Sequence, residues 1–437
     1  MSTPTTSWGR VARARAEVRE PGFLDEAARA LAGSGGGVLG YGLGRSYGDV
    51  CLTEGGTSVR MHRLDRVIRA DWASGVVRAE AGLSLDALLR LAVPRGWFLP
   101  VTPGTKFVTL GGAVANDVHG KNHETHGTFG AHVRALGLLR STGEVVEIGP
   151  DREPELFAAT VGGLGLTGLL LWVEIQLERV ASAWFDTETV RLPDLDAFFR
   201  VAGESRDWPY TVAWVDCLAK GAKLGRGLFT RGRHAETGGL TPHAGRSRAG
   251  VPLDAPAALL SAPTIRAFNA LYLRRPGAVG AGRVHYDPFL YPLDGISGWN
   301  RLYGRRGFYQ HQSVVPLAEA PRALRRLLEL TSGHGQGSFL VVLKLFGSRP
   351  SPGLLSFPRE GATFALDLPN AGETTRALLH RMVDVVMEAG GRLYPAKDAT
   401  MPASAFQAGY PRWREVERWR DPAVHSDFWK RVTRAAQ

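Results

Sequence analysis

The first 180 residues alternate between short apolar runs and short segments with helical periodicity. Apolar or alternating runs predict strands at 38–40, 67–70, 76–81, 133–139, 145–148 and 169–177. Helical periodicity predicts helices at 24–32, 85–93 and 155–160, and Ser84 precedes the second of them as a candidate N-cap. This mixture of short elements predicts an α+β domain that ends near Arg179.

The middle of the chain, from about residue 181 to residue 390, carries longer patterns. Strand-like runs cover 212–215, 339–346 and 363–368, and amphipathic helical patterns cover 317–330 and 374–388. Residues 220–256 are rich in Gly, Arg and Lys and show little periodicity. We therefore expect this segment to be a mobile, solvated loop rather than a rigid element.

Three glycine-rich clusters interrupt the predicted elements, at 40–50, 103–130 and 162–168. Glycine allows the backbone to approach a ligand closely, and the exposed N–H groups of such turns bind anions, phosphates above all. A single glycine pair would be read as a crossover between strands, but the repetition favours a phosphate-binding function. No helical pattern follows Gly44, which argues against a Rossmann dinucleotide unit.

Three motifs in these clusters resemble those of the vanillyl-alcohol-oxidase family of flavoproteins. They are GLGRSYGD at 42–49, PGT with TLGGAVANDVHGKNH between 103 and 123, and ATVGGLGLTG at 159–168. The resemblance implies an α+β fold with a two-lobed, PCMH-type FAD-binding domain. That domain would comprise residues 1–180 and be completed by the C-terminal segment 391–437, so it would be discontinuous. Residues 181–390 would form an α+β substrate-binding domain with an antiparallel sheet.

FAD is the cofactor that this resemblance implies. Transferred motif by motif, it gives these FAD contacts: Gly40, Tyr41, Gly42, Leu43, Gly44, Arg45, Ser46, Tyr47, Gly48, Asp49, Val50, Gly104, Thr109, Leu110, Gly111, Gly112, Asn116, Asp117, Val118, His119, Leu170 and Tyr394.

The resemblance also implies the oxidation of an alcohol, in which the hydroxyl must lose a proton as its carbon loses a hydride. The candidate catalytic residues are Lys397, in the sequence YPAKD, His119, and Lys344, in VVLKLFG. Lys397 could instead balance flavin charge or pair with Asp398. Lys344 could instead lie on the exposed face of its strand, since Leu343 and Leu345 would point the other way.

The predicted substrate contacts are Trp214, Gln310, Gln312, Lys344, Phe346 and Lys397. The two glutamines share one face of a predicted strand, because side chains alternate along a strand. The two aromatic residues could equally belong to the core.

The segment HGKNHETH places three histidines close together, at 119, 123 and 126. The glycines at 120 and 127 interrupt a helical, zinc-binding spacing, so we predict no metal site. We expect His119 near the flavin, and His123 and His126 in surface or structural positions.

Composition narrows the choice of partner. The chain has 437 residues, 44% of them hydrophobic and 22% charged, as in globular proteins, and only two cysteines, so no disulfide framework is predicted. A net charge of +11 favours anionic partners, but the basic residues are scattered and no nucleic-acid motif occurs, so we predict no nucleic-acid binding.

The first 20 residues lack the apolar core of a signal peptide. We expect a cytoplasmic protein that touches the inner membrane peripherally.

Within its family, the resemblance implies oxidation of the ribose 2-hydroxyl of a polyprenylphosphoryl-β-D-ribose to the 2-keto sugar. This would be the first half of a ribose-to-arabinose epimerisation for cell-wall or glycan synthesis, and an NADH- or NADPH-dependent short-chain reductase would complete it. One alternative is a soluble sugar-alcohol or aldonolactone oxidase of the same superfamily. Another is a basic protein that binds membrane surfaces without redox chemistry.

Overall fold

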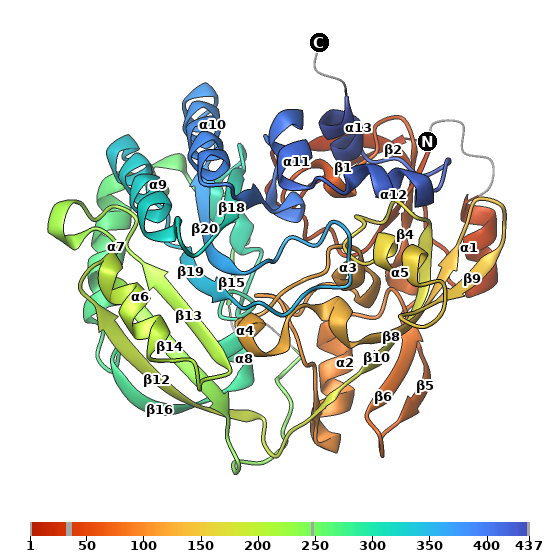
Figure 1. Ribbon diagram of the computed structural model, residues 1–437, viewed down its shortest axis with the longest axis horizontal. Coiled ribbons are helices and arrows are strands. Elements are labelled where there is room, and N and C mark those ends of the chain that lie inside the picture. The colour runs from red at the N-terminus through yellow and green to blue at the C-terminus, as the bar shows by residue number, and fades with distance from the viewer. Residues whose placement is uncertain (1, 32–36, 246–248, 435–437) are drawn as a thin grey trace.

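Two small sheets from the first 180 residues lie beside one large sheet from the middle of the chain (Figure 1). The computed structural model describes residues 2–31, 37–245 and 249–434. Both helices and sheets are present throughout, so the predicted α+β class is confirmed. The domain boundaries near residues 180 and 390 stay a prediction.

The first sheet has the strand order β1 (Ser2–Thr6), β2 (Arg13–Arg19), β4 (Thr57–Arg60), β3 (Val38–Tyr41). Strands β2 and β3 both pair in parallel with β4, whereas β1 and β2 are antiparallel. Helix α1 (Leu24–Leu31) packs Ala27 and Leu31 against this sheet. The predicted helix is confirmed as far as Leu31, and residue 32 lies outside the described residues.

The second sheet is fully antiparallel, with the order β5 (Val67–Asp71), β6 (Val76–Glu80), β10 (Leu169–Gln176), β8 (Val133–Leu139), β9 (Val145–Ile148). Helices α2 (Leu85–Ala92), α4 (His123–His126) and α5 (Pro154–Thr160) belong to the same part of the chain, together with the short pair β7 (Trp97–Phe98) and β11 (Glu178–Arg179). The predicted cap of α2 is confirmed, since Ser84 Oγ accepts a hydrogen bond from Ala87 N at 3.1 Å.

A short helix within the second glycine cluster was not predicted. Helix α3 (Leu110–Ala115) begins where Thr109 Oγ1 accepts a hydrogen bond from Gly112 N at 3.0 Å. Glycine is a poor helix former. The two glycines in this segment therefore argued against a helix at the level of sequence. Burial of Leu110 and Val114 against the second sheet stabilises the helix despite them.

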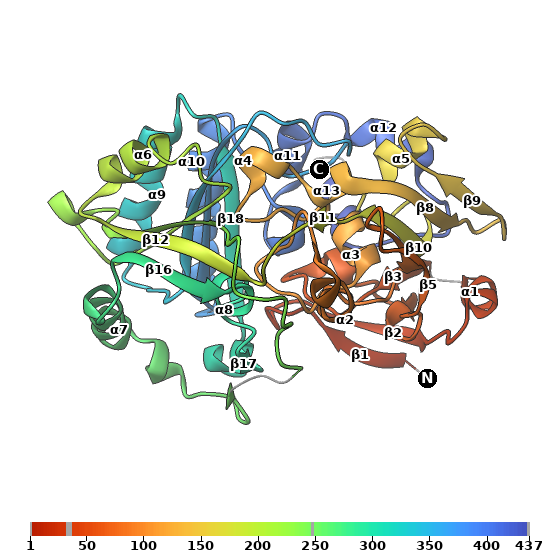
Figure 2. The same ribbon diagram turned by 90° about the horizontal axis from the view of Figure 1, so that it is seen from below.

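The large sheet is antiparallel throughout, in the order β16 (Gly280–His285), β12 (Trp184–Leu192), β14 (Gly227–His234), β13 (Tyr210–Val215), β19 (Val341–Phe346), β20 (Gly361–Pro369), β18 (Phe308–Val315), β21 (Arg392–Leu393). Helices α6 (Leu195–Gly203), α9 (Ala320–His334) and α10 (Glu373–Glu388) cover one face, while α7 (Ala262–Arg274) and α8 (Tyr286–Leu290) lie on the other side (Figure 2). A minor pair, β15 (Ala249–Gly250) and β17 (Ile296–Ser297), lies below the sheet in that view.

The prediction of a mobile loop at residues 220–256 is wrong for residues 227–234, which form strand β14. Strand β14 lies inside the large sheet, paired with both β12 and β13. Leu228 and Phe229 are buried there, and Arg231 Nη2 donates to Glu188 Oε2 at 2.8 Å. The arginine is thus satisfied by a carboxylate on the next strand, so its charge does not signal a solvated loop. Residues 246–248 of the predicted loop lie outside the described residues.

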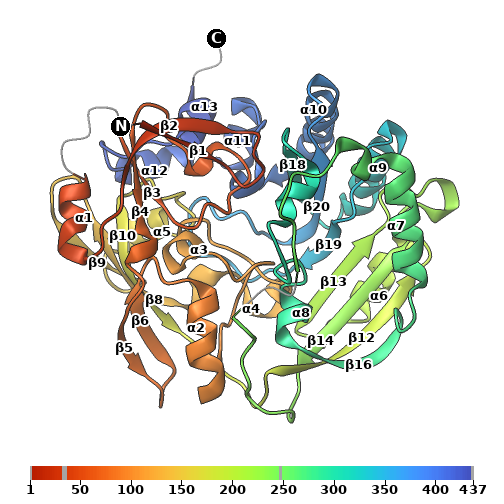
Figure 3. The same ribbon diagram turned by 180° about the vertical axis from the view of Figure 1, so that it is seen from behind.

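After β21 the chain returns to the first sheet through α11 (Ala403–Gly409), α12 (Trp413–Trp419) and α13 (Asp427–Thr433) (Figures 1 and 3). Their aromatic residues pack against Leu39 and Val50 of the N-terminal region. Arg431 of α13 fixes this return, because its guanidinium donates to Asp49 Oδ1 and Oδ2 at 2.8 and 2.9 Å and to Asp398 Oδ2 at 3.0 Å. None of the described helices is both long and apolar enough to span a bilayer.

Replacing Arg431 with alanine should destabilise the protein, because it leaves the nearly buried carboxylate of Asp398 without its cation. We expect the free energy of unfolding to fall by about 2–4 kcal/mol, the range for losing charged hydrogen bonds at a partly buried site. Chemical denaturation measures it. Arg412→Ala is the matched control, since Arg412 pairs with Glu415 at the surface and such pairs contribute about 0–1 kcal/mol. Equal losses in both variants would contradict the assigned role of Arg431.

Candidate active site

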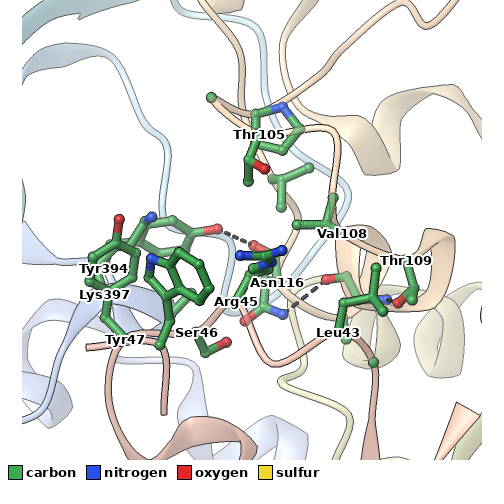
Figure 4. Close-up of a pocket in the computed structure, with 18 of the residues that line it drawn as sticks. Leu43, Arg45, Ser46, Tyr47, Thr105, Val108, Thr109, Asn116, Tyr394 and Lys397 are labelled. Atoms are coloured by element: carbon green, nitrogen blue, oxygen red, sulfur yellow. Dashed lines mark hydrogen bonds between the residues drawn. The ribbon is translucent and has the colours of Figure 1, made fainter. Parts of the chain in front are cut away.

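A cavity of about 350 Å³ lies between the two N-terminal sheets and the large sheet, which is in the size range of small-molecule sites. Of the predicted cofactor residues, the structure brings these into its lining: Gly40, Tyr41, Gly42, Leu43, Gly44, Arg45, Ser46, Tyr47, Val50, Gly104, Thr109, Gly111, Gly112, Asn116, Val118, His119, Leu170 and Tyr394. The first and second glycine clusters therefore meet around one cavity, as Figure 4 shows for ten of its residues.

The other four predicted cofactor residues contact protein instead of lining the cavity. Leu110 is buried in the core and Asp49 binds Arg431. Gly48 packs on the C-terminal segment, where an added Cβ would lie 1.6 Å from Asp398 O. Asp117 is fully buried, and its carboxylate accepts hydrogen bonds from Gly130 N at 2.8 Å and from the hydroxyls of two serines, at 351 and 356. These residues support the loops that form the cavity.

The first glycine cluster presents free donors to the cavity. In the described part of the chain, the backbone N–H groups of residues 43–46 make no hydrogen bond within the protein. Arg45 closes this side, since its guanidinium lies 4.0 Å from the ring centre of Trp8 and its Nε donates to Phe107 O at 3.1 Å. Unpaired N–H groups beside a guanidinium suit a diphosphate.

Two glycines of the lining have no packing reason to be glycine. A Cβ added at Gly104 would meet nothing within 4 Å, and one added at Gly112 would meet only Thr109 Oγ1 at 3.0 Å. Both positions face the cavity, so the side chains they lack leave its volume free. Together with the unpaired N–H groups, this free space fits a bound FAD.

Lys397 lies at one end of the cavity, on the segment that returns from the large sheet. Its Nζ lies 4.0 Å from the ring centre of Tyr47, and Figure 4 shows it beside Tyr47 and Tyr394. Burial lowers the pKa of Lys397, and attraction to the Asp367 carboxylate opposes this change. Asp398 is held by Arg431, so Asp367 rather than Asp398 is the carboxylate that acts on Lys397.

Asp367 lies on β20 and is completely buried. Its carboxylate accepts hydrogen bonds from Gln310 Nε2 at 2.5 Å and from the Tyr303 hydroxyl at 3.3 Å. Burial raises the pKa of Asp367, while these hydrogen bonds and the charge of Lys397 oppose the rise. The sequence analysis missed this residue. Its alternation with Thr363 and Ala365, which line the cavity, would have indicated the same face of the strand.

Lys344 and His119 form a second polar cluster in the cavity. Lys344 Nζ donates to Gly120 O at 3.0 Å and lies 3.3 Å from His119 Nδ1. Lys344 therefore points into the cavity, not to the outer solvent. Burial, reinforced by the nearby cations Lys121 and Lys397, lowers the pKa of Lys344 to about 7.

His119 is neutral in this environment. Burial first, and then the charge of Lys344, hold the pKa of His119 well below its usual range. Because Lys344 donates to Nδ1, the remaining ring hydrogen is on Nε2. The Gln312 amide nitrogen lies 3.0 Å from Nε2 in one orientation of the amide, and the other orientation presents the oxygen that accepts this hydrogen. His119 is thus held between two polar partners.

The two predicted aromatic walls do not line the cavity. Trp214 packs on Tyr272, with ring centres 4.6 Å apart, and its indole donates to Phe339 O at 2.9 Å. Phe346 is buried behind His119 and His123, at ring-centre distances of 4.7 and 4.4 Å. Both lie in the packed positions that the sequence left open as an alternative, whereas Gln310, Gln312, Lys344 and Lys397 do line the cavity.

The remaining histidines of HGKNHETH have structural surroundings. His123 is buried against Phe346, and His126 Nε2 lies 3.3 Å from Glu178 Oε1. Within residues 2–31, 37–245 and 249–434, no group of three or more potential metal ligands comes together.

Comparison with known proteins identifies the family. The FAD binding domain family matches residues 13–149, which confirms FAD as the cofactor. Decaprenylphosphoryl-β-D-ribose oxidase of Mycolicibacterium smegmatis is 38% identical, over 96% of this chain and 95% of its own length. An uncharacterised protein of Streptomyces coelicolor is 34% identical over 78% of this chain and 96% of its own length. L-Gulonolactone oxidase of Bos taurus is 30% identical, over only 31% of this chain and 30% of its own length.

The first of these similarities covers 96% of the chain, so it spans the parts that form the N-terminal sheets and the large sheet. It therefore includes the glycine clusters and both lysines of the cavity, whereas the similarity to the lactone oxidase covers about a third of the chain. The chain belongs to the decaprenylphosphoryl-β-D-ribose oxidase family of FAD-dependent oxidoreductases.

Proposed function

We propose that this protein oxidises the ribose 2-hydroxyl of a polyprenylphosphoryl-β-D-ribose to the 2-keto sugar, as the first half of a ribose-to-arabinose epimerisation. The observation that carries the proposal is the meeting of two lysines with different partners, Lys397 and Lys344, in the cavity that the FAD-binding glycine clusters line. FAD, when bound, supplies the hydride acceptor.

Lys397 is the residue that binds the reacting hydroxyl. Attraction to Asp367 favours its protonated form, so Lys397 donates a hydrogen bond to the hydroxyl oxygen. The same charge stabilises the negative charge that develops on this oxygen as the carbon loses its hydride. Gln310 uses its Nε2 on Asp367, which leaves its Oε1 to accept from a neighbouring sugar hydroxyl.

Lys344 is the residue that accepts the hydroxyl proton. No carboxylate pairs with it in the part of the chain that the structure describes, and its pKa of about 7 allows the neutral amine at physiological pH. The neutral amine can donate its two hydrogens to Gly120 O and His119 Nδ1, which turns its lone pair toward the cavity. Two lysines with different partners, one beside a carboxylate and one beside a neutral histidine, can thus act as the acid and the base of one reaction.

The product ketone requires a second enzyme to complete the epimerisation. A short-chain reductase that uses NADH or NADPH would reduce it with inverted stereochemistry. Since the substrate carries a lipid chain, we place both enzymes at the cytoplasmic surface of the inner membrane.

The test of the proposed function compares two classes of alcohol. Under anaerobic conditions, a polyprenylphosphoryl ribose should bleach the flavin absorbance of the purified protein. A free polyol or an aldonolactone should not. Bleaching by the lactone alone would favour the soluble oxidase, for which the similarity to L-gulonolactone oxidase covers only a third of the chain. Bleaching by neither would exclude both.

Replacing Gly104 with valine should weaken FAD binding without disturbing the fold. The added side chain enters the cavity and meets no protein atom within 4 Å at its Cβ. Overfilling a packed site costs about 1–3 kcal/mol, so the dissociation constant of FAD should rise roughly tenfold to a hundredfold. Gly333→Val, at an exposed glycine of α9 that also has free space, is the matched control. Equal FAD affinities of the two variants in a titration would contradict the assignment of Gly104 to the cofactor site.

Replacing Lys397 with alanine should leave FAD bound but slow its reduction by substrate. General acid–base groups contribute about 10²–10⁴-fold, so stopped-flow bleaching should slow by at least about a hundredfold. Lys397→Arg keeps the cation beside Asp367 and should recover part of the rate. An alanine variant that bleaches at nearly the wild-type rate would pass the role to His119 or Lys344.

The pH dependence of the reduction separates the two lysines. Because Lys344 acts as the neutral amine, the rate should rise as the pH increases through about 7. It should fall again at higher pH, when Lys397 loses its proton. Lys344→Met should abolish the rise, whereas Lys220→Met, at an exposed lysine, should keep it. The same rise in Lys344→Met would assign the base to another group.

A further inference from the structure

Four large apolar side chains are exposed on the helix α7 and the segment before it. The exposed fractions are 78% for Leu253, 47% for Leu259, 42% for Phe268 and 73% for Leu271. We call these four residues the α7 surface. Figure 2 shows α7 on the side of the large sheet that carries α8, opposite the layer of α9 and α10.

Helix periodicity explains why α7 exposes apolar residues. Its inner face buries Ile265, Asn269 and Leu273, each four residues from the next. Phe268 and Leu271, three residues apart, then share the outer face. A helix whose outer face is apolar needs a partner to cover it.

The segment that carries most of the α7 surface is basic. Residues 255–286 contain four arginines and no Asp or Glu. Arg266, Arg274 and Arg275 are exposed, and Arg275 follows Leu271 by one helical turn. The nearest acidic residue before this stretch, Asp254, is paired with Arg10 at 2.5 Å. An apolar helix face with neighbouring arginines suits a surface of anionic lipids.

A continuous run of aromatic contacts connects the α7 surface to the cavity. Starting at Tyr47 in the lining, the ring centres of Tyr47 and Phe308 are 5.4 Å apart, and those of Phe308 and Tyr303 are 4.1 Å apart. Tyr303 and Phe339 follow at 5.6 Å, and Phe339 and Phe268 at 6.1 Å. The exposed helix face is therefore four ring contacts from the residue that lies under Lys397.

We propose that the α7 surface docks this protein on an anionic lipid bilayer. The inference rests on the proposed function in one respect, because a bilayer beside the cavity would present a lipid-linked sugar to it. Leu253, Leu259, Phe268 and Leu271 enter the boundary between headgroups and acyl chains, and the arginines contact the lipid phosphates.

Vesicle sedimentation with the FAD-loaded full chain tests this proposal. The wild type should bind vesicles of phosphatidylcholine mixed equally with phosphatidylglycerol and bind pure phosphatidylcholine weakly. Phe268→Ser with Leu271→Ser should lower the affinity for the mixed vesicles at least about tenfold, since the apolar area that enters the bilayer is lost. Ile68→Ser with Val145→Ser, at exposed apolar positions of β5 and β9, should change nothing.

Substitution of the arginines provides a second, independent test of the proposal. Each basic residue near an anionic surface contributes about fivefold in affinity, so Arg274→Gln with Arg275→Gln should lose roughly twentyfold to thirtyfold. Arg414→Gln with Arg418→Gln, at exposed positions of α12, has the same change in net charge and should retain binding. Equal losses in both pairs would show an effect of net charge alone and overturn the assignment to α7.

Activity in detergent distinguishes docking from the reaction itself. The α7 variants should oxidise detergent-dispersed polyprenylphosphoryl ribose at the wild-type rate. A wild type that oxidises this substrate but ignores the mixed vesicles would overturn the docking proposal alone, and one that binds vesicles but oxidises no such substrate would overturn the proposed function alone. Self-association of the wild type that Phe268→Ser abolishes, without vesicle binding, would assign the surface to a second copy of the chain.

Discussion

The cavity depends on one contact between distant parts of the chain, where the C-terminal segment lies against the first glycine cluster. Tyr47 N donates to Ala396 O at 2.9 Å, and Gly48 approaches Asp398 so closely that no side chain would fit. Arg431 then holds the two segments of this contact together by donating hydrogen bonds to Asp49 and Asp398. Lys397 is between these fixed points, so its place beside Tyr47 follows from the backbone. A cation held in this way needs no rearrangement before it acts.

Low polarity around the two lysines affects their charges differently. Burial disfavours the charge of both, but among the described residues a carboxylate acts on Lys397 and none acts on Lys344. That carboxylate, Asp367, is itself buried and held by Gln310. An isolated cation in such a place would lose its proton. Lys397 therefore depends on Asp367 to stay charged. Lys344 instead contacts His119 Nδ1 and Gly120 O, which accept hydrogen bonds from either protonation state.

The sequence predicted most strands and helices because their apolar patterns match the burial that the structure imposes. It failed where composition and environment diverge. The glycines of α3 conceal a helix that the core stabilises, and the Arg-rich strand β14 has a carboxylate on its neighbour, Glu188. In the site, motifs placed the glycine clusters, Lys344 and Lys397 around one cavity. The place of Trp214 depends on α7, which packs over it, and the role of Asp367 depends on a segment 30 residues further along the chain; neither relation is visible locally.

The face of the large sheet that bears Gln310, Gln312 and Lys344 changes in polarity along its length. Polar residues occupy the part of this face that meets the glycine clusters, whereas aromatic rings cover the part that continues toward α7. Most of these rings are buried, so they form a packed link between the cavity and α7 rather than a surface open to a ligand. The apolar side chains exposed on α7 extend the same gradient to the outside of the molecule. Packed aromatic rings thus connect the cavity that holds the two lysines to the exposed side chains of α7.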